Sequence, residues 1–402
     1  MANPAPRMIG VDEHLAAVVE LVGVTPVAEL PLADCLGLVL ARDLVSAIAL
    51  PPFDNSAMDG YAVRAADVAD APVELPVAGD IPAGRVDLPE LAHGTALRIM
   101  TGAPVPPGAD AVVQVELTDG GTERVLVHGD VPEGAHIRRA GEDVRPGSVV
   151  LRAGAELGAA QLGLAAAVGA AVLPVRRRPR VLVLSTGSEL VEPGTPLLHG
   201  QIYESNGVML AAAVTAAGAL PTLLRFVPDD VAAFHAALDE HLSTVDLVLT
   251  SGGVSAGAYE VVKDALAGNG VEFRKVAMQP GMPQGAGRYR GVPVVTLPGN
   301  PVSAQVSFEV FVRPALRAAM GHRSPGRPRL SARLTEPVRS PAGRRQFRRG
   351  VHDPVAGTVS PVGGPGSHLL GALALADCLI EVPEPLAELA AGDLVTVLPL
   401  AP

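Results

Sequence analysis

The chain of 402 residues lacks several features that would place it in common classes of protein. It has only two cysteines, Cys35 and Cys378, which excludes a disulfide framework and a cysteine-rich zinc site. Its mean hydropathy is +0.33, but no stretch approaches the ~20 uninterrupted apolar residues of a membrane-spanning helix. Residues 1–10 contain no hydrophobic signal region. We therefore expect a cytoplasmic protein with no membrane partner.

Lysine and tryptophan are also scarce, because Lys263 and Lys275 are the only lysines and tryptophan is absent. The net charge of −11 argues against a nucleic-acid partner. Eleven arginines nevertheless lie between Arg313 and Arg349, with Glu336 as the only acid among them. We interpret this segment as a solvated face with an interdomain contact, and an anion-attracting rim is the alternative.

Glycine and proline, 44 and 38 residues, divide the chain into three or four modules. A first helix is predicted over 12–23 from the spacing of its apolar residues. Between 51 and 139, short β-branched runs broken by Pro and Gly predict a small all-β module. Its strands are expected at 73–78, 96–100, 111–116 and 124–127, and an alanine-rich helix is expected over 156–171.

The pattern changes after an arginine- and proline-containing linker at 176–180, where apolar strands begin to alternate with amphipathic helices. This alternation predicts an α/β domain with a doubly wound, mostly parallel sheet and helices on both faces. The expected strands are 181–185, 222–226, 246–250, 272–277 and 292–297. The expected helices are 207–218 (capped by Ser205 or Asn206), 230–242, 259–267 and 301–320. Short strands return after Pro328.

Three strands of this sheet end in loops that combine glycines with hydroxyl side chains. Ligands bind beyond the carboxyl ends of parallel strands, glycine lets the backbone approach them closely, and hydroxyls donate to oxyanions. Asn300 suits the N-cap of the helix that follows the third loop, and Pro301 suits its first position. The loops predict a ligand that carries a phosphate or another oxyanion. Their residues are Ser185, Thr186, Gly187, Ser188 and Glu189; Ser251, Gly252, Gly253 and Ser255; and Pro298, Gly299, Asn300, Pro301 and Ser303.

Acidic residues accompany these loops and the polar turns of the β module. Carboxylates that face a phosphate site commonly hold Mg²⁺, although a solvated turn or a helix cap is the alternative for each acid alone. Asp59 stands out because it lies in a polar stretch, residues 51–62, that interrupts an otherwise apolar module. The other acids are Asp54, Asp110, Glu142, Asp143, Glu189, Asp229, Asp230 and Glu260. The histidines show no metal-ligand spacing.

Seven segments, in chain order, resemble the molybdopterin molybdenumtransferase (molybdenum insertase) family, to which the gephyrin E domain also belongs. The segments are PPFDNSAMDGYAV (51–63), IMTGAPVPPGADAVVQVE (99–116), GEDV (141–144), STGSELVEPG (185–194), GQIYESNG (200–207), SGGVSAG (251–257) and LPGNPVSA (297–304).

The resemblance implies a multidomain protein of α/β and β modules. A discontinuous linking domain (1–50 and 141–178) would carry an inserted β domain (51–140), followed by an α/β molybdopterin-binding domain (179–328) and a C-terminal β domain (329–402). It also implies a homodimer with shared active sites.

The implied reaction joins molybdate to adenylylated molybdopterin in a Mg²⁺-dependent step that releases AMP and the molybdenum cofactor. A molybdopterin adenylyltransferase and recipient molybdoenzymes would be partners. By resemblance, Glu189 and Asp229 would hold Mg²⁺, Thr101 and Ser367 would donate hydrogen bonds, and Lys275 would contact phosphate or molybdate. The remaining expected site residues are Asp59, Asp143, Glu260, Pro298 and Pro301.

Two positions depart from the family pattern. Glu260 stands where the family commonly has aspartate, and the lysine-bearing K-P-G-K-P turn is here Gln279-Pro280-Gly281-Met282-Pro283. Lys275 or arginines of the 313–349 segment would have to replace the two missing cations. The alternative functions are a molybdopterin adenylyltransferase, whose domain resembles residues 179–328, and a gephyrin-like scaffold.

Overall fold

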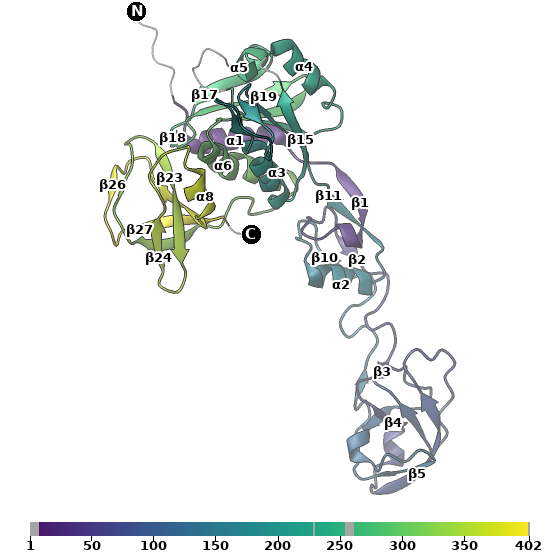
Figure 1. Cartoon of the computed structure of the whole chain (residues 1–402). Helices are drawn as coiled ribbons and strands as arrows, with labels where there is room; N and C mark the ends of the chain where they lie inside the picture. Colours follow the sequence, from purple (N-terminus) through teal and green to yellow (C-terminus); the bar gives the residue numbers. More distant parts are fainter. Residues whose placement is uncertain (1–7, 228–229, 254–260, 401–402) are drawn as a thin grey trace, which may run out of the picture. The chain divides into compact units, whose positions relative to one another are not determined.

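The computed structural model describes residues 8–227, 230–253 and 261–400 (Figure 1). The chain forms two compact units, which are described separately below. The larger unit comprises residues 1–29, 37–41 and 174–402, and the smaller unit comprises 30–36 and 42–173. None of the helices within the described ranges has the length and apolar character needed to cross a membrane.

A six-stranded mixed sheet forms the centre of the larger unit. Its first four strands in spatial order run parallel, whereas β19 is antiparallel to both of its neighbours. The prediction of a mostly parallel sheet is therefore confirmed. The order is β15 (Leu220–Val227), β12 (Arg180–Thr186), β16 (Leu247–Ser251), β20 (Val292–Leu297), β19 (Pro283–Tyr289) and β17 (Val271–Lys275).

Helices cover both faces of this sheet, as the sequence predicts (Figure 1). Successive residues of a strand point to opposite faces, so Val183 packs in one core cluster with Leu210 and Phe311. Its neighbour Leu184 packs in the other cluster with Phe234. The first cluster includes residues of α1 (Val11–Val22), α3 (Asn206–Ala216), α6 (Pro301–Ser307) and α7 (Arg313–Ala319). The second includes residues of α4 (Val231–Asp239) and α5 (Val261–Leu266).

Strand β19 is absent from the strands expected from the sequence, because Gly285 and Gly287 give its segment a low strand propensity. Close packing explains both glycines. A Cβ at Gly285 would lie 2.2 Å from Thr296 Oγ1, and one at Gly287 would lie 2.0 Å from the Gly270 carbonyl oxygen. The strand therefore forms where a side chain would not fit.

The helix predicted over 301–320 is interrupted by a π-helical segment, η4 (Phe308–Val312), between α6 and α7. Pro314, two residues after this segment, has no N–H to donate to the carbonyl four residues earlier, so the regular hydrogen-bond ladder cannot continue through this point. The segment is nevertheless helical from Pro301 to Ala319, so the predicted helix is confirmed, and the sequence did not indicate the π-helical turn within it.

The C-terminal strands of the larger unit form a second six-stranded sheet, which an additional β23–β25 pairing closes on itself. Ala332, Val359, Ile380 and Val397 are buried within it. Its order is β18 (Met278–Gln279), β23 (Arg345–Asp353), β24 (Thr358–Pro361), β21 (Leu330–Leu334), β27 (Leu394–Pro399) and β25 (Cys378–Val382). The strands β22 (Val338–Arg339) and β26 (Glu388–Leu389) pair separately, and α8 (Leu370–Ala374) precedes β25.

The smaller unit is built around a five-stranded sheet, in agreement with the predicted β module. Tyr61, Leu75, Val113 and Val125 form part of its core. The sheet order is β7 (Ala111–Gln114), β4 (Gly60–Val63), β6 (Ala96–Ile99), β5 (Val73–Ile81) and β8 (Arg124–Val127). Shorter pairs are β3 (Asn55–Ser56) with β9 (Ile137–Arg138) and β2 (Leu44–Val45) with β10 (Val149–Leu151). The strands β1 (Val27–Pro31) and β11 (Val172–Arg176) pair with each other, and the chain passes from one unit to the other within each of them. Helix α2 (Ala159–Ala167) is shorter than the predicted 156–171.

Candidate active site

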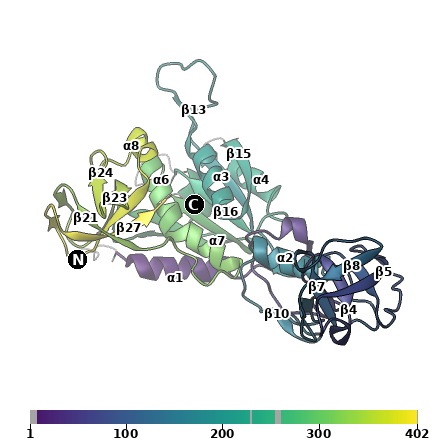
Figure 2. The ribbon, with the colours of Figure 1, turned by 90° about the horizontal axis from the view of Figure 1, so that it is seen from below.

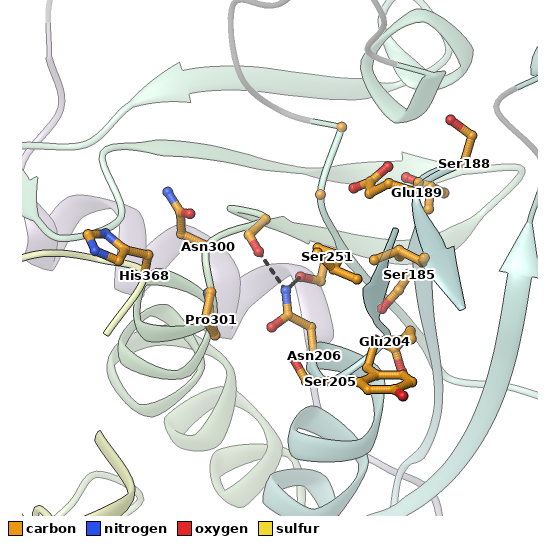
Figure 3. Close-up of a pocket in the computed structure, with 18 of the residues that line it drawn as sticks. Ser185, Ser188, Glu189, Glu204, Ser205, Asn206, Ser251, Asn300, Pro301 and His368 are labelled. Atoms are coloured by element: carbon orange, nitrogen blue, oxygen red, sulfur yellow. Dashed lines mark hydrogen bonds between the residues drawn. The ribbon is translucent and has the colours of Figure 1, made fainter. Parts of the chain in front are cut away.

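The three loops predicted to bind an oxyanion meet at one edge of the central sheet. Their strands are parallel neighbours, and the register pairs Ser185 with Ser251 and Ser251 with Leu297. The loops surround a cavity of about 940 Å³ (Figure 3). This first cavity is lined by Ser185, Thr186, Gly187, Ser188, Glu189, Leu190, Ile202, Tyr203, Glu204, Ser205, Asn206, Ser251, Gly252, Gly253, Val261, Gly299, Asn300, Pro301, His368 and Leu370.

Two of these loops come so close together that glycine is required at their contact. A Cβ at Gly299 would lie 3.3 Å from the Cα of Gly252, which is tighter than an ordinary carbon contact. Gly252 itself has φ +93°, a backbone conformation that residues with a Cβ rarely adopt. The glycines therefore allow the second and third loops to form one continuous backbone wall.

Asn206 at the start of α3 links these loops. Its Nδ2 donates to Ser251 Oγ at 2.9 Å and to the Gly299 carbonyl oxygen at 2.6 Å (Figure 3). Ser205 occupies the N-cap position of this helix, which is one of the two caps predicted, but its side chain makes no capping hydrogen bond. Glu204 takes that role, and its Oε1 accepts from the Gly207 N–H at 2.6 Å. The Asn206 amide is thus available to hold the loops.

Asn300 and Pro301 occupy the N-cap and first helical positions of α6, as predicted. The Asn300 side chain makes no capping hydrogen bond and is exposed, and it lines the first cavity and a second one. Its amide is therefore available to a ligand.

The second cavity, of about 490 Å³, adjoins the first through Gly299 and Asn300. Arg344 is the only charged side chain that lines it in the part of the chain described by the structure. Gln279 and Met282, which stand where the family pattern has lysines, line this cavity too. Its other lining residues are Met278, Pro280, Gly281, Pro283, Pro298, Ser303, Pro365, Gly366 and Ser367.

Glu189 is the predicted metal ligand that the structure places at the first cavity, where its side chain is exposed. A Cβ at Gly187 would lie 2.8 Å from both of its carboxylate oxygens, so the carboxylate rests over the glycine. The other predicted ligand, Asp229, lies outside the described residues, as do Ser255 and Glu260. Across 8–227, 230–253 and 261–400, no three His, Cys, Asp or Glu side chains gather into a metal site.

Lys275 was expected to contact phosphate or molybdate, but it lines neither cavity. It is exposed at the end of β17, and its carbonyl oxygen accepts from the Ile9 N–H at 3.0 Å. The cation nearest to the expected role, among the described residues, is Arg344.

Asp59, Thr101 and Asp143 belong to the smaller unit. The Asp59 Oδ1 atom accepts from the backbone N–H and from the hydroxyl of Thr101, both at 2.7 Å. The backbone N–H first, and then the hydroxyl, lower the pKa of this exposed carboxyl, which is therefore ionised at neutral pH. Asp143 is exposed, and its N–H donates to the Leu50 carbonyl oxygen at 3.0 Å.

Reasoning from the sequence did not single out Glu204, Asn206, His368 or Arg344 as individual site residues. Glu204 and Asn206 lie within the recognisable GQIYESNG segment, which is the signal that could have identified them. Arg344 lies within the arginine-rich segment. His368 had no sequence signal.

Three family models match successive parts of the chain. Residues 9–169 match the family described as "MoeA N-terminal region (domain I and II)", residues 182–318 match "Probable molybdopterin binding domain", and residues 331–400 match "MoeA C-terminal region (domain IV)".

Curated relatives and solved structures give the same result. A Mycobacterium tuberculosis protein named molybdopterin molybdenumtransferase 2 is 57% identical over 396 residues, covering 96% of this chain and 98% of the relative. The molybdopterin molybdenumtransferase of Haemophilus influenzae is 39% identical, covering 92% of this chain and 93% of the relative. The crystal structure of a molybdopterin biosynthesis MoeA protein from Pyrococcus horikoshii superposes with a TM-score of 0.83 at 32% identity, covering 98% of this chain and 100% of that chain. The chain belongs to the molybdopterin molybdenumtransferase family.

Proposed function

We propose that this protein transfers molybdate to adenylylated molybdopterin and releases AMP and the molybdenum cofactor. The observation that carries the proposal is the pair of cavities that adjoin at Gly299 and Asn300. A reaction that joins a large phosphate-bearing substrate to a small oxyanion needs two adjoining sites of unequal size.

The first cavity suits the adenylylated molybdopterin. The backbone of Gly253 and the Asn300 amide offer donors to phosphate oxygens, and Leu190 and Ile202 offer apolar contacts to a flat ring. Its volume of about 940 Å³ lies at the upper end of the usual range for ligand sites.

The second cavity suits molybdate. Arg344 has no hydrogen bond or ion pair among the described residues, so its charge is available to a dianion. Ser303, Ser367 and the Asn300 amide supply neutral donors around it. Arg344 thereby replaces the cations that Gln279 and Met282 do not provide.

Mg²⁺ fits the chemistry of the first cavity when it is bound together with substrate. This ion commonly uses one or two carboxylates plus substrate phosphates rather than a cage of protein ligands. Glu189 would supply one carboxylate, and Asp229 is the second candidate by resemblance. The ion would neutralise charge on the phosphates and polarise the phosphoryl group.

We further propose that the enzyme is a homodimer with shared active sites. By family resemblance, the ionised Asp59 and its partner Thr101 act on the substrate bound by a second copy of the chain. Their hydrogen bonds fix the carboxylate in one orientation. Neither residue lines the two cavities of the larger unit.

The proposal is tested by incubating the purified protein with adenylylated molybdopterin, molybdate and Mg²⁺. We expect molybdate-dependent release of AMP and activation of an apo-molybdoenzyme. Absence of both would refute the proposal. Consumption of ATP with unmodified molybdopterin would instead identify an adenylyltransferase.

A further inference from the structure

Three buried polar atoms at the first cavity have no hydrogen-bond partner among the described residues. They are Oγ of Ser185, Oε2 of Glu204 and Oδ1 of Asn206, and all three residues line the cavity. Figure 3 shows them toward the same end of the cavity, away from His368. Buried polar atoms in proteins are nearly always paired, so three orphans in one place indicate that a ligand supplies the partners.

The unpaired carboxylate oxygen of Glu204 is the most costly of these three atoms to bury. Its side chain is only 2% exposed, yet it forms no ion pair with any described residue. The single N–H of Gly207 satisfies Oε1, whereas Oε2 accepts nothing. A buried carboxylate is costly unless donors surround it, so this wall of the cavity requires hydrogen-bond donors from the ligand.

The orientation of the Asn206 amide is determined by its neighbours. The Gly299 carbonyl oxygen can only accept, so the atom that contacts it at 2.6 Å must be Nδ2. Ser251 Oγ, the second acceptor of Nδ2, donates its own proton to the Pro298 carbonyl oxygen at 3.4 Å. Oδ1 is therefore an acceptor, and the wall presents two acceptors beside the Ser185 hydroxyl.

This pattern excludes a phosphate at the wall and favours a neutral group with adjacent N–H donors. None of the described residues that line the first cavity is a lysine or an arginine, so an anion placed against Glu204 would face repulsion without compensation. A carboxylate and an amide oxygen together can accept from two neighbouring N–H groups, and a hydroxyl can donate to a nearby carbonyl or ring nitrogen.

We propose that Glu204, Asn206 and Ser185 bind the 2-amino-4-oxo edge of the pterin ring and so determine which heterocycle the enzyme accepts. This inference rests on the proposed function, because it places the pterin end of the substrate in the first cavity. Glu204 accepts from the 2-amino group, Asn206 accepts from a second N–H of that edge, and Ser185 donates to a ring acceptor.

The test measures the affinity of simple ligands for the full-length protein by isothermal titration calorimetry. The probes are pterin, lumazine (which has oxygen in place of the 2-amino group) and AMP. The variant Glu204→Gln keeps the size of the side chain and an oxygen for the Gly207 N–H, but it removes the charge. Glu381→Gln is the matched control, because Glu381 is also a buried acid, 6% exposed, and lines neither cavity. Far-UV circular dichroism confirms that each variant is folded.

We expect Glu204→Gln to weaken pterin binding at least tenfold, as the loss of a charged hydrogen bond does. Lumazine should bind the wild type more weakly than pterin, and the substitution should change its affinity much less. AMP affinity should stay within twofold, and Glu381→Gln should bind all three probes as the wild type does.

Equal pterin affinity in the wild type and in folded Glu204→Gln would overturn the inference. A loss of AMP affinity with pterin affinity unchanged would also overturn it, because the donors would then be ribose hydroxyls. If Glu204→Gln does not fold, Ser185→Ala replaces it and should weaken pterin but not AMP. Molybdate-dependent AMP release by the wild type separates the two proposals. If the wild type releases no AMP, the proposed function is refuted. If it releases AMP but Glu204→Gln does not weaken pterin binding, only this inference is refuted.

Discussion

His14 should make the larger unit less stable in mild acid. The side chain lies on α1 and is 3% exposed, and its ring packs edge-on against Phe311 with 4.6 Å between the ring centroids. Its Nε2 has no hydrogen-bond partner among the described residues. Burial, and to a smaller extent the charge of Arg274, lowers the pKa of His14 from 6.5 to about 4.

The size of the effect follows from the two pKa values. The unfolded chain binds a proton at His14 near pH 6.5, whereas the folded chain binds it only near pH 4, so the folded state loses stability as the pH falls between them. Each pKa unit corresponds to about 1.4 kcal/mol, so the full loss is about 3 kcal/mol. Between pH 7.5 and pH 5 the expected loss is about 2 kcal/mol.

The measurement is urea unfolding followed by far-UV circular dichroism at pH 7.5 and pH 5, since the chain has no tryptophan to report by fluorescence. His14→Leu should remove about 2 kcal/mol of the pH dependence seen in the wild type. His128→Leu, which replaces an exposed histidine of the smaller unit, is the control and should not change it. The reasoning is refuted if His14→Leu and the wild type lose the same stability between the two pH values.

Three further predictions concern the site and its support. Arg344→Gln should raise the molybdate concentration needed for half-maximal AMP release at least tenfold, whereas substitution of the exposed Arg339 by Gln should not. If Arg344→Gln and the wild type need the same molybdate concentration, Arg344 does not bind the oxyanion. Asp59→Asn and Glu189→Gln should each lower turnover far more than substrate binding. A mixture of the two variant proteins should regain activity after subunit exchange, whereas a site formed within one subunit would show no recovery. Asp246 is partly buried, and although burial raises its pKa, hydrogen bonds from Arg177 and Arg180 lower it to about 2; Asp246→Asn should therefore lower the melting temperature at pH 7, and an unchanged value would contradict this role.

The sequence predicted the central sheet well because its strands are continuous apolar runs. Residues 181–185 and 292–297, for example, lie within β12 and form β20. The sequence failed where tertiary contacts override local preference. Strand β19, for example, contains two glycines that close packing against its neighbours requires.

The candidate site was predictable where backbone topology alone determines it. Parallel strands end at the same edge, so the loops after β12, β16 and β20 had to meet. Arg344 and Glu204 could not be identified in this way. Arg344 reaches the second cavity from the loop before β23, far from the central sheet in the sequence, and one arginine among eleven carries no local signal. Glu204 lies within the recognisable GQIYESNG segment, but its burial, which makes it a candidate, follows only from tertiary packing.

A loop connects β13 (Leu190–Val191) to β14 (Ile202–Tyr203). Figure 2 shows this loop extending away from the central sheet beyond β13. Its two ends, Leu190 and the pair Ile202 and Tyr203, line the first cavity, so the loop is anchored at the site.

The central claim is that the two adjoining cavities hold the two substrates, and a crystal of the protein soaked with molybdate and AMP tests it most directly. Anomalous scattering identifies molybdenum without reference to the shape of the density. The account predicts a molybdenum peak beside Arg344, Ser303 and Ser367, with AMP in the first cavity across Gly299 and Asn300. A molybdenum peak at any other position, with the second cavity empty, would contradict it.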